Sequence, residues 1–270
     1  MDNAAKQMKS GQYKVMVSHF VQYVPLVREL VGRDLKVKYR RSFLGYIWSV
    51  LNPLLMMMVQ TIIFSYMFRS NIPNYPLYLI CGNTLFTFFN ESANMGLVSI
   101  IQNAALIKKV YIPKYIFPLS RVVSSFVTMS FSLAAVVLVM LITRSPLHWT
   151  ILLFWIPLLF LLIFCAGVAM TLSALTVYFR DIQHLFGVVT LGWNYATPIF
   201  YPIEQLPDFA QALMKFNPMY HYINFFRNLV MYGNIPGPNT WIACAVSSFV
   251  MLFVGLWTFR KLQRNFILYV

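Results

Sequence analysis

Residues 33–53 read RDLKVKYRRSFLGYIWSVLNP, a stretch in which a group of cations is followed at once by apolar and aromatic residues. The cations are Arg33, Lys36, Lys38, Arg40 and Arg41. Lysine and arginine beside an apolar run are typical of a membrane surface, where they meet anionic headgroups and resist translocation. This boundary therefore predicts that the chain enters a membrane near residue 44.

The composition of the whole chain agrees with a membrane protein. Of its 270 residues, 59% are hydrophobic and only 10% are charged, and the mean hydropathy is +0.66. A water-soluble domain of this size could not bury so much apolar surface, so the excess is expected to face lipid. The formal charge of +14 belongs to the loops between apolar segments, and nucleic acid is not an expected partner.

The cysteines and the first residues complete this general picture. Cys81, Cys165 and Cys244 each lie inside an apolar segment without paired spacing, which indicates small apolar residues and not a disulfide or zinc site. Cys165 also forms a ridge of small residues with Ala169 and Ser173, suited to close helix packing. The N-terminal residues lack the apolar core of a signal peptide, so we expect the chain to begin on the side where it is made.

Six segments are long and apolar enough to be predicted as membrane-spanning helices, since a span needs about 20 residues. Pro198 interrupts the fifth segment, which is also the shortest. The expected spans are residues 44–68, 78–101, 122–142, 151–176, 185–201 and 241–259.

The distribution of cations predicts the orientation of these spans. Seventeen of the 21 lysines and arginines precede the first span or lie in the 102–121 connection, the 177–184 turn or the tail. The other side has only Arg69, Arg144, Lys215 and Arg227. Both termini are therefore expected in the cytoplasm.

The segment before the first span also has a helical pattern. Between residues 26 and 37, apolar residues cover one half of a helical wheel and charged residues the other. The apolar half holds Leu26, Val27, Leu30, Val31, Leu35 and Val37, and the charged half holds Arg28, Glu29, Arg33 and Lys36. Asp34 and Lys38 interrupt the apolar half. The pattern predicts an imperfect amphipathic helix along the inner membrane surface.

Catalytic and metal-binding motifs are absent from the sequence. It has no G-x-x-x-x-G-K-[ST] phosphate loop, no H-E-x-x-H and no G-x-S-x-G. Of the seven carboxylates, only Glu91 lies within an expected span, which disfavours a carrier driven by ions. We therefore expect no enzyme, no catalytic residue, no metal, and no ATP hydrolysis by this chain alone.

The second span has one polar face. Asn83, Thr87, Asn90 and Asn94 recur at intervals of four, three and four, which places them on one narrow side of a helix. Polar groups are costly in lipid, so this face is expected to look inward. A hydrogen-bonded helix interface and the polar lining of a conduit both fit this pattern.

Residues 202–239 predict two short external helices. LPDFAQALMKF, residues 206–216, has a helix start at Asp208, and MYHYINFFRNLVMYG, residues 219–233, has a stop at Gly233. Neither is long enough to span, so both are expected to dip back from the outer surface, with a break at Asn217-Pro218. The many aromatic residues nearby fit either a belt at headgroup level or a surface that stacks on sugars.

The order and spacing of four motifs resemble the permease subunits of type-2 ABC exporters, particularly those that move polyprenyl-linked O-antigen, capsule or teichoic acid. The resemblance covers nearly the whole chain. The motifs are RDLKVKYRRSFLGYIWSVLNPL at 33–54, NAALIKKVYIPKYIFPLSR at 103–121, LTVYFRDIQHLFGV at 175–188, and NYATPIFYPIEQLP followed by NPMYHYINFFRNLVMYG.

This resemblance implies an all-α integral membrane domain over residues 1–270, located in the bacterial cytoplasmic (inner) membrane. Its parts would be a cytoplasmic interface segment at 1–43, spans one to five at 44–201, an external gate segment at 202–239, and span six with a cytoplasmic tail at 240–270. A homodimer would provide twelve spans around a conduit. Two copies of a separate ATPase would bind ATP and Mg, and this chain would bind no cofactor.

The resemblance also implies roles by region. A helix at 103–115 would dock on the ATPase through Leu106, Ile107, Lys108, Lys109, Val110 and Tyr111. The five cations of residues 33–41 would receive the diphosphate of a lipid-linked glycan, although anionic headgroups alone would also satisfy them. The external gate would use Tyr195, Tyr201, Phe216, Tyr220, Tyr222, Phe225 and Phe226.

Two other functions remain open at this point. A type-2 ABC exporter of a drug or small lipid would have the same fold. A membrane-embedded transferase or phosphatase would need clustered carboxylates or a His-Arg phosphate site, and the sequence has neither.

Overall fold

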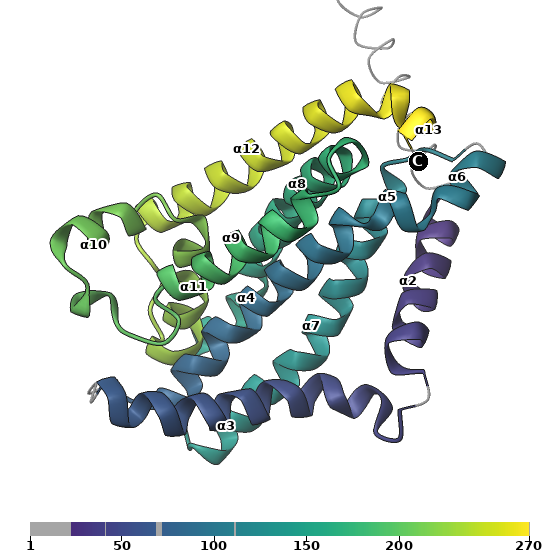
Figure 1. The fold of residues 1–270 in the computed structure, drawn as a ribbon. Helices are drawn as coiled ribbons and strands as arrows, with labels where there is room; N and C mark the ends of the chain where they lie inside the picture. The colour runs from purple at the N-terminus through teal and green to yellow at the C-terminus, as the bar shows by residue number, and fades with distance from the viewer. Residues whose placement is uncertain (1–22, 41, 69–71, 111, 270) are drawn as a thin grey trace, which may run out of the picture.

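The computed structural model describes residues 23–40, 42–68, 72–110 and 112–269, and within these ranges the chain is helical without a strand (Figure 1). Seven long helices carry the fold. They are α2 (Val24–Tyr39), α3 (Trp48–Phe68), α4 (Tyr75–Leu97), α7 (Ile116–Ile142), α8 (Trp155–Tyr178), α9 (Ile182–Ala196) and α12 (Pro238–Leu262). The short helices are α5 (Ser99–Gln102), α6 (Ala104–Lys109), α10 (Asp208–Met214), α11 (Pro218–Arg227) and α13 (Phe266–Tyr269).

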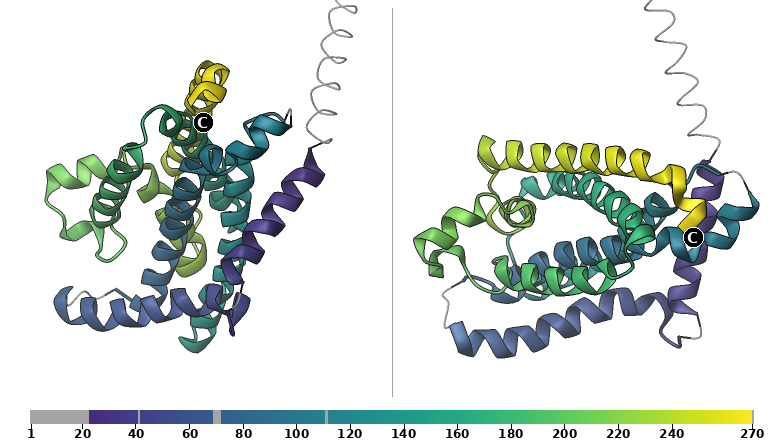
Figure 2. Two further views of the ribbon diagram at one scale, coloured as in Figure 1. Left: turned by 45° about the vertical axis from the view of Figure 1, so that its right-hand side comes forward. Right: turned by 45° about the horizontal axis from the view of Figure 1, so that its top comes forward.

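The two ends of the bundle are built differently. The start of α2, with α5, α6 and α13, gathers at one end, whereas α10 lies towards the opposite end (Figure 1). We call these the α6 end and the α10 end. In a second view α12, α8, α4 and α3 follow one another across the bundle (Figure 2, right), and α3 crosses α4 and α7.

Four segments of the described chain are long and apolar enough to span a membrane: Gly45–Ser65, Ile116–Ile142, Trp149–Tyr178 and Pro238–Asn265. They correspond to the first, third, fourth and sixth predicted spans. The second corresponds to α4, which has 23 residues but a strip of polar side chains. The fifth corresponds to α9, which has only 15 residues because Pro198 follows it closely. Six spans therefore remain a prediction.

Helix α4 lies in the centre of the bundle. It packs against α3, α7, α8 and α11, and most of its side chains are buried. The exposed side chains on α4 are Thr87, Asn90 and Asn94, all of them polar. The exposed strip of α4 thus coincides with the polar face that the sequence predicts.

Small residues allow the long helices to approach closely. The predicted ridge of Cys165, Ala169 and Ser173 on α8 is fully buried. A Cβ atom on Gly96 of α4 would lie 2.5 Å from the Cβ of Ala169. Likewise, a Cβ on Gly167 would lie 2.3 Å from the backbone oxygen of Met251 on α12. These contacts confirm that the ridge has a packing role, because neighbouring backbones pass within van der Waals distance there.

The two short helices predicted between residues 206 and 233 are present. Helix α10 begins at Asp208, and α11 begins after Asn217, whose side chain accepts a hydrogen bond of 3.0 Å from the amide of Met219. A π-helical turn, Asn228–Tyr232, ends at Gly233, where φ is +66°. Their entry into the membrane from outside remains a prediction.

Arg227, at the end of α11, is buried although the sequence places it among the external cations. Its guanidinium donates to the backbone oxygens of Tyr78, Pro198 and Ile199 at 2.9–3.3 Å. It also lies 3.4 Å from the ring centroid of Tyr78. A Cβ on Gly82 would be 2.7 Å from its Nη2 atom, so that glycine makes room for the guanidinium. Arg227 thereby fastens α11 to α4 and to the bend after α9.

We predict that Arg227→Lys destabilises the protein, because one ammonium cannot reach three carbonyl oxygens and each buried acceptor left unpaired costs about 1–3 kcal/mol. The thermal unfolding midpoint of the purified protein in detergent should fall by several degrees. Gly82→Ala should lower it as well, since its new methyl group displaces the guanidinium. Arg180→Lys, at an exposed arginine, is the matched control. Equal midpoints for Arg227→Lys and Arg180→Lys would contradict this role.

Candidate functional site

A charged cluster at the α6 end joins α2 to α7. The side chain of Asp34 is only 4% exposed, and it accepts from Arg121 Nη1 on α7 at 2.8 Å. Ser124 Oγ donates to the other Asp34 oxygen at 3.2 Å, and Arg33 Nη2 lies at 3.4 Å. Asp34 lies on the apolar half of the predicted amphipathic helix because that half faces α7, where Arg121 pairs with it.

The same cluster reaches the segment that precedes α6. Asn103 Oδ1 accepts from both terminal nitrogens of Arg33 at 3.2 Å, and its amide nitrogen donates to the backbone oxygen of Ser99 at 2.7 Å. Gln102 Oε1 accepts from Arg121 Nη2 at 2.9 Å. The start of α6 is therefore linked by hydrogen bonds to both α2 and α7.

The second residue that interrupts the apolar half of α2, Lys38, has a similar explanation. Its Nζ lies 2.6 Å from Oε1 of Glu91 on α4, an ion pair between residues 53 positions apart. Glu91 is the one carboxylate inside a predicted span, and the sequence offers no means of finding its partner. Next to Lys38, the Tyr39 hydroxyl hydrogen-bonds Ser49 at the start of α3.

The structure divides the cations of residues 33–41 into two groups. All four described cations are exposed, and Arg33 and Lys38 in addition bond to side chains on other elements, as described above. Arg41 lies outside the described residues. Among the described cations of this stretch, Arg33 and Lys38 line a common cavity at the α6 end.

Helix α6 presents a different face from the one the sequence suggests. Ile107 is buried in a cluster that also includes Leu30 and Phe117, and Leu106 is partly buried against that cluster. Ala105, Lys108, Lys109 and Val110 are exposed. The prediction that Ile107 faces a partner is corrected, because this side chain packs inside the chain. Tyr111 lies outside the described residues.

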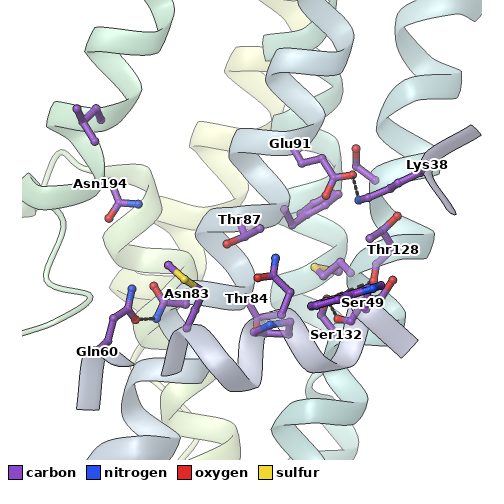
Figure 3. A pocket seen from close by; sticks show the side chains of 18 of the residues that line it. Lys38, Ser49, Gln60, Asn83, Thr84, Thr87, Glu91, Thr128, Ser132 and Asn194 are labelled. Atoms are coloured by element: carbon purple, nitrogen blue, oxygen red, sulfur yellow. Dashed lines mark hydrogen bonds and ion pairs between the residues drawn. The ribbon is translucent and has the colours of Figure 1, made fainter. Parts of the chain in front are cut away.

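A cavity of about 400 Å³ lies between α3, α4, α7 and α9 (Figure 3). Asn83 and Thr87 of the predicted conduit face line it, and Asn83 donates a hydrogen bond to Gln60 of α3. Gln60 and Asn194 on α9 also line it, and the sequence pattern identifies neither. Apart from Lys38 and Glu91, the described residues around this cavity are uncharged.

Two buried polar atoms in the wall of this cavity have no hydrogen-bond partner in the described structure. They are Thr84 Oγ1 and Asn194 Oδ1, and the whole Thr84 residue is only 3% exposed. Both atoms lie beneath the cavity surface, and a buried polar atom without a partner is costly. The amides and hydroxyls of Gln60, Asn83 and Thr87 leave the cavity able to hydrogen-bond an occupant that carries hydroxyl groups.

The remaining residues of the predicted conduit face continue along α4 towards its end. Asn90 and Asn94 do not line the cavity, and both are exposed. The Asn94 amide donates to the backbone oxygen of Asn90 at 2.8 Å and to its side-chain oxygen at 2.6 Å. The four residues thus share one face of α4. Asn83 and Thr87 line the cavity, and Asn90 and Asn94 lie beyond it.

The aromatic residues predicted to form an external gate lie in several environments. Tyr195 and Phe216 are exposed. The Tyr201 hydroxyl donates to the backbone oxygens of Tyr195 and Ala196 at 2.8 and 3.1 Å. Tyr220 lines a second cavity at the α10 end. These four rings are accessible or lie at the rim of the bundle.

The other three gate residues pack in the core. The Tyr222 hydroxyl hydrogen-bonds Ser248 of α12 at 2.7 Å, and the Phe225 ring lies 4.7 Å from the Trp241 ring. Phe226 belongs to the same core and is 2% exposed. Their assignment to a sugar-contacting surface is corrected, because α11 turns this face towards α4, α8 and α12.

The second cavity, of about 490 Å³, lies between the α3–α4 connection, residues 198–205 and α11. Tyr78, Tyr220, Tyr232, Glu204 and Arg227 line it. Burial raises the pKa of Tyr220 and of Tyr232, so both phenols keep their protons at neutral pH. The wall thus combines phenol hydroxyl groups and flat rings with the charged side chains of Glu204 and Arg227.

Metal and thiol chemistry find little support in the described residues. Within them, no three histidine, cysteine or acidic side chains are grouped closely enough to hold a metal ion. All three cysteines are free and buried. The arrangement therefore offers hydrogen bonds, aromatic faces and paired charges.

Comparison with known proteins gives one family and several relatives of nearly equal length. The ABC-2 type transporter family matches residues 25–231. The O-antigen export system permease protein RfbA of Myxococcus xanthus is 31% identical over 93% of this chain and 97% of that protein. An RfbA of Klebsiella pneumoniae is 33% identical over 88% of this chain and 92% of its own.

A more distant relative is the polysialic acid transport protein KpsM of Escherichia coli, 23% identical over 88% of this chain and 93% of that protein. The family match covers α2 to α11 and hence both the charged cluster and the cavity on α4. With these similarities over most of its length, the chain belongs to the ABC-2 type transporter family of membrane proteins.

Proposed function

We propose that this chain is the transmembrane subunit of an ATP-driven exporter that moves a polyprenyl-diphosphate-linked polysaccharide across the cytoplasmic membrane. The relatives named for O-antigen export and polysialic acid transport support a polysaccharide as the substrate. The structural observation that carries the proposal is the exposed polar strip of α4, which borders a cavity with amide and hydroxyl groups in its wall. An exporter of apolar drugs would be expected to present an apolar wall there.

Six spans complete this proposal, with α4 and α9 added to the four apolar segments. An even number of spans places both termini on one side of the membrane. The start of α2 and the end of α13 both lie at the α6 end, which supports this topology (Figure 1). The α6 end would then face the cytoplasm, and α10 and α11 would dip into the outer leaflet.

A homodimer is proposed because the polar strip of α4 is uncovered in one copy. Thr87, Asn90 and Asn94 facing hydrocarbon would be costly. A second copy opposite this strip would enclose it in a polar conduit. Exposed apolar side chains on α3 and α9, beside the strip, would provide the contact between the copies.

A separate ATPase is proposed as the second partner, with two copies per dimer that bind ATP and Mg. This chain has no phosphate loop, and α6 offers an exposed surface at the cytoplasmic end. Ala105 and Val110 would pack in a groove of the ATPase, while Lys108 and Lys109 would meet its polar rim. The hydrogen bonds around Asn103 would connect this docking helix to α2 and α7.

The cations and the outer rings have proposed roles along the same path. The basic stretch of residues 33–41 would receive the lipid-linked diphosphate from the cytoplasmic side. Tyr195, Tyr201, Phe216 and Tyr220 would contact the emerging polymer at the outer end. Flat rings exclude water without binding any one hydroxyl tightly, so a polymer could slide past them.

The function is tested by deleting the chain from its host and restoring it together with its ATPase. We expect lipid-linked polysaccharide to accumulate in the cytoplasmic leaflet of the deletion strain, and surface polysaccharide to return on restoration. Surface polysaccharide that is unaffected by the deletion would reject the proposal.

We predict that Ala105→Glu combined with Val110→Glu abolishes co-purification of the ATPase, because two carboxylates would be buried unpaired in its groove. Ile107 is left unchanged since it belongs to the core. Leu213→Glu, at an exposed position on α10 at the other end, is the matched control. Undiminished co-purification of the double variant, at normal membrane levels, would place the docking surface elsewhere.

For the conduit, we predict that Thr87→Leu combined with Asn90→Leu lowers export about tenfold or more, the effect of losing about 1.4 kcal/mol of interaction with the moving polymer. Surface polysaccharide would be measured at equal amounts of membrane-inserted protein. Both positions are exposed, so little packing is lost.

Ser130→Leu, at an exposed position on α7, is the matched control for this pair. Unchanged export by the double variant would exclude the α4 strip from the path. The same assay applied to Phe216→Ala with Tyr220→Ala tests the outer rings, and we expect less surface polysaccharide. A normal amount would show that these two rings have only a structural role.

A further inference from the structure

The Lys38–Glu91 ion pair stands between two cavities. One is the cavity on α4 described above, and the other, of about 560 Å³, lies at the α6 end between α2, α4, the start of α6 and α7. Among the described residues, Lys38 and Glu91 are the two that line both cavities. Figure 3 shows Lys38 extending from α2 to meet Glu91 on α4, above the polar residues of the α4 cavity. The two cavities therefore adjoin at this pair, and a path from one to the other would run past it.

The α6-end cavity is rich in charge. Arg33, Lys38 and Arg121 contribute cations to its wall, and Asp34 and Glu91 contribute carboxylates. Arg121 is 13% exposed and is held by Asp34 at 2.8 Å, so it is already neutralised. Arg33 and Lys38 are 44% and 39% exposed. These two cations are therefore the ones that an entering anion would meet.

Arg33 is held by weaker partners than Arg121. Its hydrogen bonds of 3.2 Å go to the neutral amide oxygen of Asn103, and its contact with Asp34 is longer, at 3.4 Å. A charged phosphate oxygen is a stronger acceptor for a guanidinium than an amide oxygen. Lys38, by contrast, has a full carboxylate at 2.6 Å, so any anion must compete with Glu91 for it.

The two cavities differ in the chemistry they would accept. The α6-end cavity offers two exchangeable cations, while the α4 cavity offers amides and hydroxyls, among them those of Gln60, Asn83 and Thr87. A molecule with an anionic head joined to a neutral, hydroxyl-rich chain matches this order of cavities.

We propose that Lys38 and Glu91 form an exchange site: the diphosphate of the lipid-linked substrate replaces Glu91 as the partner of Lys38, with Arg33 as the second cation. This proposal rests on the function proposed above and assigns the diphosphate to particular residues. A diphosphate carries more charge than one carboxylate, so it attracts the ammonium more strongly. Once displaced, Glu91 is repelled by the diphosphate, and the passage between the two cavities opens.

The pair would have a purely structural role if it only fastened α2 to α4. The two possibilities predict different changes in the affinity for an anion when Glu91 is neutralised. A structural pair loses the same contact whichever partner is neutralised. An exchange site gains affinity for an anion when Glu91 is neutralised, because a competitor is removed, and loses affinity when Lys38 is neutralised.

The experiment measures binding of farnesyl diphosphate to the purified complex of this chain with its ATPase in nanodiscs of neutral lipid. We expect Lys38→Gln to weaken binding at least tenfold and Glu91→Gln to strengthen it severalfold. Arg28→Gln and Glu29→Gln are matched controls for each loss of charge, because both residues are exposed on α2 and neither lines the cavity. Both controls should leave the affinity unchanged.

Further arms of the experiment identify the source of the anion. Farnesol, which lacks the diphosphate, should not bind competitively, and nanodiscs containing phosphatidylglycerol should reduce the affinity only slightly. Complete competition by phosphatidylglycerol would show that the site receives bulk anionic lipid and would overturn the assignment to a diphosphate. Weakened binding in both Lys38→Gln and Glu91→Gln, or no change in either, would also overturn it.

The gain in affinity on Glu91→Gln is the decisive result, since misfolding cannot produce it. Polysaccharide export does not enter the binding measurement, so the two proposals fail separately. If this chain is needed for polysaccharide export, but Lys38→Gln and Glu91→Gln do not change the affinity for farnesyl diphosphate in opposite directions, the exchange site alone is rejected. If Lys38→Gln weakens and Glu91→Gln strengthens diphosphate binding, but the host exports polysaccharide normally without this chain, the proposed function alone is rejected.

Discussion

A polar side chain left without a partner in an apolar environment costs about 2–7 kcal/mol, and α4 carries Thr87, Asn90 and Asn94 along one face. This cost decides which side of α4 can be covered by other helices and which side must be kept away from lipid. The apolar sides are buried against α7, α8 and α11. The polar side borders the cavity beside α3 and α9 and, in the proposed dimer, the space between two copies.

Charged contacts hold the two ends of this arrangement in a defined geometry. At the α10 end, Arg227 uses carbonyl oxygens and the face of Tyr78 in place of a carboxylate. At the α6 end, Asp34 is enclosed by Arg121, Arg33 and Ser124. Removing one partner of a buried ion pair costs about 3–5 kcal/mol. A displacement of α6 would therefore be passed on to α2 and α7 through the charged cluster.

Local sequence signals predicted the helices well, because they depend on neighbouring residues. The break at Asn217-Pro218, the start of α10 at Asp208 and the end at Gly233 are all present. The same reasoning failed for aromatic side chains. Tyr222, Phe225 and Phe226 lie in a ring-rich segment that the sequence predicts to be external, but residue type does not say whether a ring faces outward or packs on a neighbouring helix. Ile107 was misplaced for the same reason.

The sequence by itself determined the membrane class, the approximate extent of each long helix, the polar face of α4 and, by resemblance, the family. Each of these depends on the length of an apolar run, a helical period or a local turn residue. Only the tertiary structure decided the partners of the charges: Lys38 with Glu91, 53 residues apart, and Arg227 with the oxygen of Tyr78, 149 residues apart. Such pairs depend on which helices lie side by side and at what depth, and no local pattern in the chain records that arrangement.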